Sequence, residues 1–137
     1  MSDDVLINKA AAIEHCVARA REEYGKDVAT FATDFTRQDA AVLNIQRACE
    51  AALDMGQHIV RREKLGVPQS ARDVFALMAA AGWIDSDMAG RLAKMTGYRN
   101  VAVHNYQKLL LPVTVAIITL HLQDFLDFSQ TVLLKAG

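Results

Sequence analysis

The chain has 137 residues, of which 52% are hydrophobic and 23% charged, and these values are typical of one folded domain covering residues 1–137. Fifteen basic and sixteen acidic residues give a net charge of -1. Bulk charge therefore gives no support for non-specific binding to nucleic acid, and any affinity for phosphate must be local.

Helical periodicity dominates the sequence from its start. Apolar residues at three- and four-residue steps predict a first helix over Leu6–Tyr24. Residues 28–35 are expected to form a connector with at most one helical turn. Thr36 and Asp39 resemble a capping box, so a long second helix is expected to begin there and to end at residues 65–68, where glycine is followed by proline.

Three further helices follow. Ser70 with Asp73 predicts the N-terminus of a short third helix that ends near Gly82, and Asp85 predicts the cap of a fourth. A last helix is expected over residues 112–134, with proline at its first position. Four or five helices joined by short links predict an all-α, antiparallel bundle.

The last predicted helix is apolar around nearly its whole circumference in its first half. Its apolar stretch, Leu109–Leu122, is shorter than the roughly 20 residues that span a bilayer and contains polar residues, so we expect a buried helix and no membrane. A helix that is apolar all round needs cover on two sides. The bundle core can cover one side, and a second subunit of a homodimer the other.

The cysteines and the N-terminus indicate a cytoplasmic protein. Cys16 and Cys49 fall on apolar helix faces, as small buried residues in a reducing compartment do, rather than in a disulfide framework or zinc site. The acidic N-terminus lacks the basic start and apolar run of a signal peptide.

Four functional side chains gather after Gly97, which ends an apolar-periodic segment: Arg99, Asn100, His104 and Tyr106. The guanidinium of Arg99 is a planar fork of donors suited to phosphate. His104 can take and give a proton near neutrality, since an unperturbed histidine has a pKa of about 6.5. Cleavage of a phosphodiester needs both functions.

The spacing of Arg99 and His104 is awkward for a regular helix. Five residues correspond to about 500° of rotation and roughly 7.5 Å of rise, so the two side chains lie about 140° apart. They can converge on one phosphate if the helix is irregular, or if a two-fold dimer supplies the partner group from a second copy. An Arg and a His at this spacing are also common as a surface charge and a half-buried ring.

RNA is the substrate that fits these residues, because its ribose 2′-hydroxyl is a built-in nucleophile and no metal or other cofactor is needed. His104 would deprotonate that hydroxyl or protonate the leaving 5′-oxygen, and Arg99 would stabilise the transition-state charge. Asn100 would orient the phosphate or hold one imidazole tautomer. The expected products carry a 2′,3′-cyclic phosphate and a free 5′-hydroxyl.

The segment Gly97-Tyr98-Arg99-Asn100…His104-Asn105-Tyr106 resembles the motif of HepT-type toxins in the HEPN superfamily. Residues 45–60, 66–68 and 82–84 are similar to that family's earlier segments, and the resemblance runs in order over nearly the whole chain, from Ile7 to Leu126.

The resemblance implies roles for individual residues. Arg99 and His104 match the ribonuclease pair, and Asn100 matches a supporting position. Tyr106 matches the tyrosine to which a partner minimal nucleotidyltransferase (MNT) antitoxin attaches AMP. Many members have acidic residues around that tyrosine, whereas this chain has Asn105 and then a basic and apolar run from residue 108.

Two other hypotheses remain open from the sequence. A non-catalytic subunit that positions substrate for a separate nucleotidyltransferase would suit the near-neutral charge, and a merely structural helical dimer would need no active site. Asp54 and His58 form an i, i+4 pair on the polar side of the second helix and could line the edge of a cleft. No further ligand at metal-binding spacing accompanies them, so we expect no metal site.

Overall fold

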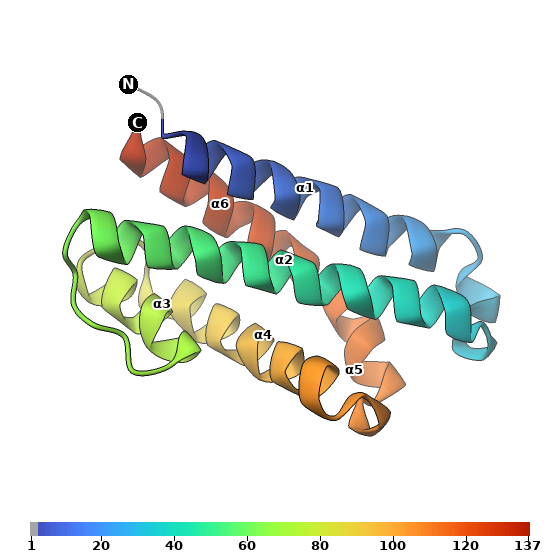
Figure 1. The fold of residues 1–137 in the computed structure, drawn as a ribbon. Helices are drawn as coiled ribbons and strands as arrows, with labels where there is room; N and C mark the ends of the chain where they lie inside the picture. Colours follow the sequence, from blue (N-terminus) through green and yellow to red (C-terminus); the bar gives the residue numbers. More distant parts are fainter. Residues whose placement is uncertain (1–2) are drawn as a thin grey trace.

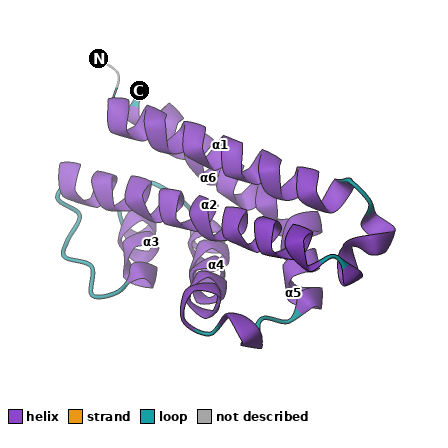
Figure 2. Cartoon of the chain, turned by 45° about the vertical axis from the view of Figure 1, so that its right-hand side comes forward, coloured by secondary structure: helices purple, strands orange, loops and turns teal. Residues whose placement is uncertain are grey.

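The computed structural model describes residues 3–137, and within that range the chain contains only helices and the loops that join them (Figure 2). This confirms the all-α prediction. In chain order the elements are α1 (Asp4–Gly25), the 3-10 helix η1 (Val28–Thr33), α2 (Phe35–Arg62), α3 (Ala71–Ala80), α4 (Ser86–His104), the 3-10 helix η2 (Tyr106–Lys108), α5 (Leu111–Ala116), the π-helix η3 (Ile117–His121) and α6 (Leu122–Ala136).

The long helices are antiparallel neighbours along the chain. The chain passes along α1, reverses at η1, returns along α2, runs forward again along α4 and returns along α6 (Figure 1). The end of α4, η2 and α5 consequently lie at the same end of the bundle as η1 and the start of α2. This places the residues around Arg99 and Tyr106 beside the first turns of α2.

The predicted caps hold for two helices and fail for α2. The side chains of Ser70 and Asp85 accept hydrogen bonds from the N-termini of α3 and α4, as expected. The predicted capping box of Thr36 and Asp39 is wrong, because α2 already begins at Phe35 and the carboxylate of Asp34 accepts from the Arg37 amide at 3.1 Å. Asp39 is left free for another contact.

Two predicted helix boundaries also differ, and the last helix has an irregularity that the sequence did not predict. Helix α2 ends at Arg62, before the predicted residues 65–68. Gly97 does not end a helix: α4 continues to His104, and a Cβ atom at Gly97 would lie 3.3 Å from Nη2 of Arg72. The predicted last helix contains a π-helical turn at η3.

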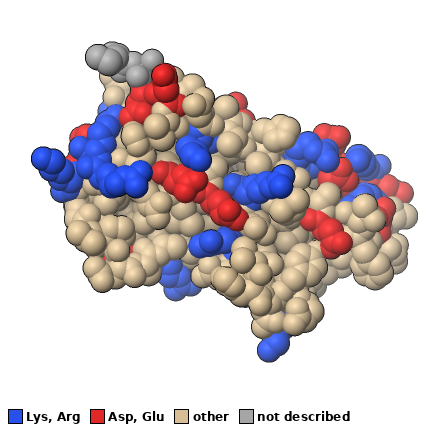
Figure 3. Space-filling model, in the orientation of Figure 1, with Lys and Arg blue, Asp and Glu red and all other residues tan. Residues whose placement is uncertain are grey.

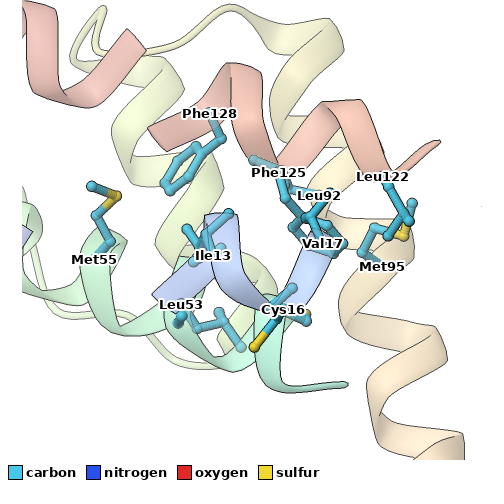
Figure 4. Close-up of a cluster of buried hydrophobic side chains, with 14 of the residues drawn as sticks. Ile13, Cys16, Val17, Leu53, Met55, Leu92, Met95, Leu122, Phe125 and Phe128 are labelled. Atoms are coloured by element: carbon cyan, nitrogen blue, oxygen red, sulfur yellow. The ribbon is translucent and has the colours of Figure 1, made fainter. Parts of the chain in front are cut away.

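The core lies between α1, α2, α4 and α6, whose apolar faces meet along the length of the bundle (Figure 4). Phe125 and Phe128 of α6 are fully buried, as are Ile13 of α1 and Leu92 of α4. Cys16 and Cys49 are buried free thiols, as the sequence predicts. The core also includes Phe75 and Trp83.

The segment Leu111–Ala136 is long and apolar enough to cross a membrane by length and composition alone. In the structure its inner face packs into the bundle, where Leu122, Phe125 and Phe128 are buried, so it is a core helix. Its other face leaves Val113 45% exposed and Leu120 71% exposed. The second cover that this helix was expected to need is not supplied by the described part of the chain itself.

Close packing of α2 against α3 generates a first prediction. A Cβ atom at Gly56 would lie 2.8 Å from Cγ1 of Val74 and 3.2 Å from Sδ of Met78. Gly56→Ala should therefore lower the free energy of unfolding by about 1–3 kcal/mol, the usual cost of overpacking. As a matched control, Gly90→Ala in α4 should raise it by about 0.5–1 kcal/mol, since the added methyl group meets nothing and improves helix propensity.

Urea unfolding of both variants measures the two changes. If Gly56→Ala stabilises the protein as much as Gly90→Ala does, α2 and α3 are not in the close contact described.

Candidate functional site

Arg99 lies in α4 with its side chain partly enclosed between helices. Its Nε atom is buried and has no hydrogen-bond partner among the described residues. The positive charge of Arg99 also acts on the buried thiol of Cys49 in α2. Burial raises the pKa of that thiol to about 11, and the Arg99 guanidinium acts to lower the same pKa. Arg99 therefore lies close to α2, and one donor of its guanidinium is unpaired among the described residues.

His104 is the last residue of α4 and is exposed. Because α4 is a regular helix from Ser86 to His104, Arg99 and His104 lie about 140° apart around its axis, and one chain does not bring them onto one face. Asn100 is also exposed, and its i, i+4 relation to His104 places the two side chains on the same face. An amide beside an imidazole can hold one tautomer of the ring.

Tyr106 follows the end of α4 and opens η2. Its hydroxyl donates a hydrogen bond to the carboxylate of Asp39 in α2, and 43% of the residue remains exposed. Burial and the Asp39 carboxylate both raise the pKa of the Tyr106 phenol. The phenol is therefore held in its protonated form and is still reachable from solvent.

A small cavity of about 170 Å³ adjoins Tyr106 between α2 and the η2–α5 segment. Its lining is a mixture of apolar side chains and amide or hydroxyl groups, namely Gln38, Val42, Gln107, Leu109, Leu111 and Thr114 together with Tyr106 itself.

Tyr98 fixes the same region from inside. It is buried, and its hydroxyl shares a hydrogen bond of 2.7 Å with Oγ1 of Thr114 in α5. Burial also raises the pKa of Tyr98. This hydrogen bond joins α4 to α5 on either side of the η2 segment that carries Tyr106. The two ends of that segment are therefore held in place.

Asp54 and His58 do not pair with each other, which corrects the prediction. Asp54 bonds to Lys9 at 3.0 Å, and His58 bonds to Asp3 at 2.7 Å, so both contact the N-terminal part of the chain. Asp54 also lies 15 residues along α2 from Asp39, or about 22 Å by helical rise, so Asp54 and His58 belong to the end of α2 away from Tyr106. The structure gives no support to a cleft-lining role for either residue.

The described residues contain no group of three or more His, Cys, Asp or Glu side chains that could hold a metal ion. On the face that carries α2, acidic and basic side chains alternate without a broad basic patch (Figure 3). This agrees with a phosphate site formed by a few residues rather than by a charged surface.

Sequence reasoning missed Asp39 as a site residue, because it assigned this side chain to a helix cap. The contact between Asp39 and Tyr106 joins residues 67 positions apart. No local pattern indicates such a contact, which depends on the start of α2 lying beside the end of α4.

The helical bundle and its motif define a HEPN-type domain. A family model described as Ribonuclease HepT-like matches residues 13–132, and the chain belongs to this family. The chain is 45% identical over 130 residues to the mRNA nuclease HepT of Shewanella oneidensis, covering 95% of this chain and 97% of that protein.

Two solved structures are similar over essentially the whole chain, each with a TM-score of 0.92 and 44% identity. One is a toxin–antitoxin complex with AMP-PNP, covering 98% of this chain and 100% of that one. The other is a tri-AMPylated Shewanella oneidensis HEPN toxin in complex with MNT antitoxin, covering 99% and 100%.

The environment of Tyr106 predicts its titration. Since its pKa is raised, its phenol should keep its proton at pH values where an exposed tyrosine, with a pKa of about 10, has lost it. The stability that this group contributes is thus present below about pH 10 and is lost as the pH rises through the folded-state pKa. Asp39→Ala should shift the midpoint back toward the ordinary value.

The phenolate absorbance of each protein, corrected by subtracting that of its Tyr106→Phe counterpart, measures this midpoint. An unchanged midpoint in Asp39→Ala would contradict the contact between the two side chains.

Proposed function

We propose that this chain is the toxin of a HepT/MNT-type toxin–antitoxin pair, a cytoplasmic endoribonuclease that acts as a homodimer and needs no metal ion. The observation that carries the proposal is the placement of Arg99 and His104 on one helix of a chain in the Ribonuclease HepT-like family. Arg99 has a buried donor without a partner, and His104 is open to solvent. An unpaired guanidinium donor suits a residue that binds phosphate, and an exposed imidazole suits a residue that exchanges protons.

The regular geometry of α4 favours a site shared between two copies. A two-fold interface places the same patch of each chain opposite its copy. Arg99 of one chain can then face His104 of the other across a cleft, which removes the 140° separation within one helix. Val113 and Leu120 leave apolar surface exposed on the C-terminal segment, as expected for a face that a second copy covers.

In this cleft His104 exchanges a proton with the ribose 2′-hydroxyl or the leaving 5′-oxygen, which is typically worth about 10²–10⁴-fold in rate. Arg99 donates to the phosphate oxygens as negative charge accumulates on them. Asn100, on the same face as His104, holds the imidazole or the phosphate in place. The 2′-oxygen attacks the adjacent phosphorus, so the products carry a 2′,3′-cyclic phosphate and a 5′-hydroxyl.

Neutralisation is assigned to Tyr106, because this residue is 43% exposed and lies only two positions from His104. An MNT antitoxin would transfer AMP to it. The added phosphodiester brings a negative charge and a bulky nucleoside to the edge of the cleft, and both exclude an RNA strand. The tri-AMPylated Shewanella oneidensis toxin supports this mode of control.

The shared site predicts complementation between inactive variants. Arg99→Ala and His104→Ala should each lose about 10²-fold or more of RNA cleavage, and Arg99→Lys should restore it only in part because an ammonium lacks the bidentate fork. When the two alanine variants are unfolded together and refolded, half of the dimers carry one intact site, so roughly a quarter of wild-type activity should return.

Cleavage of RNA in EDTA measures these activities, and light scattering should give a mass near twice 15.1 kDa. A mixture as inactive as its components would place both residues of each site in the same chain. Equal cleavage by wild type and His104→Ala would remove the ribonuclease assignment and favour a non-catalytic binding subunit.

The proposed neutralisation predicts that Tyr106→Phe cannot be modified. The variant lacks the acceptor oxygen but keeps the ring, so incubation with the MNT antitoxin and ATP should leave its intact mass unchanged, whereas the wild type should gain one or more whole AMP units. Co-expression of the antitoxin should protect cells from the wild type but not from the variant. Equal protection from both would show that neutralisation occurs by complex formation.

A further inference from the structure

The acceptor hydroxyl of Tyr106 already has a proton acceptor on a different helix. Asp39 lies in the second turn of α2 and receives the hydrogen bond from the Tyr106 hydroxyl. Asp39 is exposed and makes no helix cap, because Asp34 performs that function. Its carboxylate is therefore available for chemistry at Tyr106.

We propose that Asp39 is the proton acceptor when AMP is transferred to Tyr106, so that the toxin itself supplies one catalytic group for its own inactivation. The inference rests on the covalent neutralisation proposed above. It assigns to Asp39 a role in a reaction whose other groups belong to the antitoxin.

The step balances with ATP as the donor. The Oη atom of Tyr106 forms a bond to the α-phosphorus of ATP, while the bond from that phosphorus to the oxygen bridging to the β-phosphate breaks. Pyrophosphate leaves with the electron pair of the broken bond, and the phenolic proton passes to the Asp39 carboxylate. The products are the tyrosyl ester of AMP, pyrophosphate and a protonated Asp39, which returns its proton to water.

A nearby base is needed because the phenol does not ionise by itself. Burial and the negative charge of Asp39 both raise the pKa of Tyr106, so the reaction begins from the neutral phenol. The acidity of Oη increases steeply as it bonds to phosphorus, and a carboxylate already in hydrogen-bond contact can take the proton as that happens.

The position of Asp39 is set by the bundle before any partner binds. Its helix is capped by Asp34, and Arg37, two residues earlier, is anchored by four hydrogen bonds. On the other side, the bond between Tyr98 and Thr114 fixes the segments that flank Tyr106. The pair is thus preorganised, and this lowers the cost of reaching the reactive geometry.

Asp39→Asn is the decisive variant. Its amide oxygen can still accept the hydrogen bond from Tyr106 and has nearly the same size, but an amide does not take up the proton. With the MNT antitoxin at saturating ATP, the maximal rate of AMP incorporation should fall by about 10²-fold, while the toxin concentration at half-maximal rate stays unchanged. Asp39→Glu, which keeps a carboxylate, should recover most of the loss.

Asp87→Asn is the matched control, since it removes the same charge from an exposed position at the opposite end of α4 and should be modified at the wild-type rate. Circular dichroism and thermal unfolding verify that all variants are folded.

The outcomes separate the two proposals. Wild-type rates in Asp39→Asn overturn the role of Asp39 but leave covalent neutralisation intact. A loss seen only as weaker binding, with an unchanged maximal rate, assigns Asp39 to the docking surface and also overturns it. Absence of modification in the wild type removes covalent neutralisation and this inference together.

Discussion

The corner between α1 and α2 is held by one buried cation, the guanidinium of Arg37. Its Nε atom donates to the carbonyl oxygen of Glu23 at 2.8 Å, Nη2 donates to those of Tyr24 and Asp27, and Nη1 donates to the hydroxyl of Thr30 at 3.0 Å. The first two carbonyls belong to the last turn of α1, whose oxygens lack partners within the helix and attract positive charge. One side chain thereby fixes where α1 stops, how the chain reverses and where α2 starts.

The geometry of this corner sets the position of Asp39 relative to Tyr106. Because α2 starts at a fixed place, Asp39 lies beside the loop that follows α4 and meets Tyr106. Tyr98 anchors the same loop from inside through Thr114. The two tyrosines of the motif thus differ in role. Tyr98 is buried and stabilises the contact between α4 and α5, whereas Tyr106 is partly exposed at the surface. The candidate site therefore comprises the end of the bundle rather than α4 alone.

Local sequence signals predicted the helices well where a helix end depends on its own residues. Ser70 and Asp85 cap the helices that they were expected to cap, and the apolar stripes of α1, α2 and α4 are buried. The start of α2 was misplaced because Thr36 and Asp39 resemble a capping box, whereas the side chain that caps the helix is that of Asp34. The motif identified its own residues, but it could not reveal Asp39, since that contact depends on how distant segments pack.

Arg99 bears both on the stability of the fold and on the proposed inactivation by AMP transfer to Tyr106. A buried donor without a partner, such as Nε of Arg99, costs free energy in the folded chain. With a net charge near zero, the chain would attract RNA mainly through local groups such as the Arg99 guanidinium. The proposed AMP group on Tyr106 would carry the same phosphodiester charge as RNA, and its covalent tether would give it an effective concentration of about a millimolar at the proposed cleft. Under the proposed mechanism, free RNA would have to compete with an anion that cannot diffuse away.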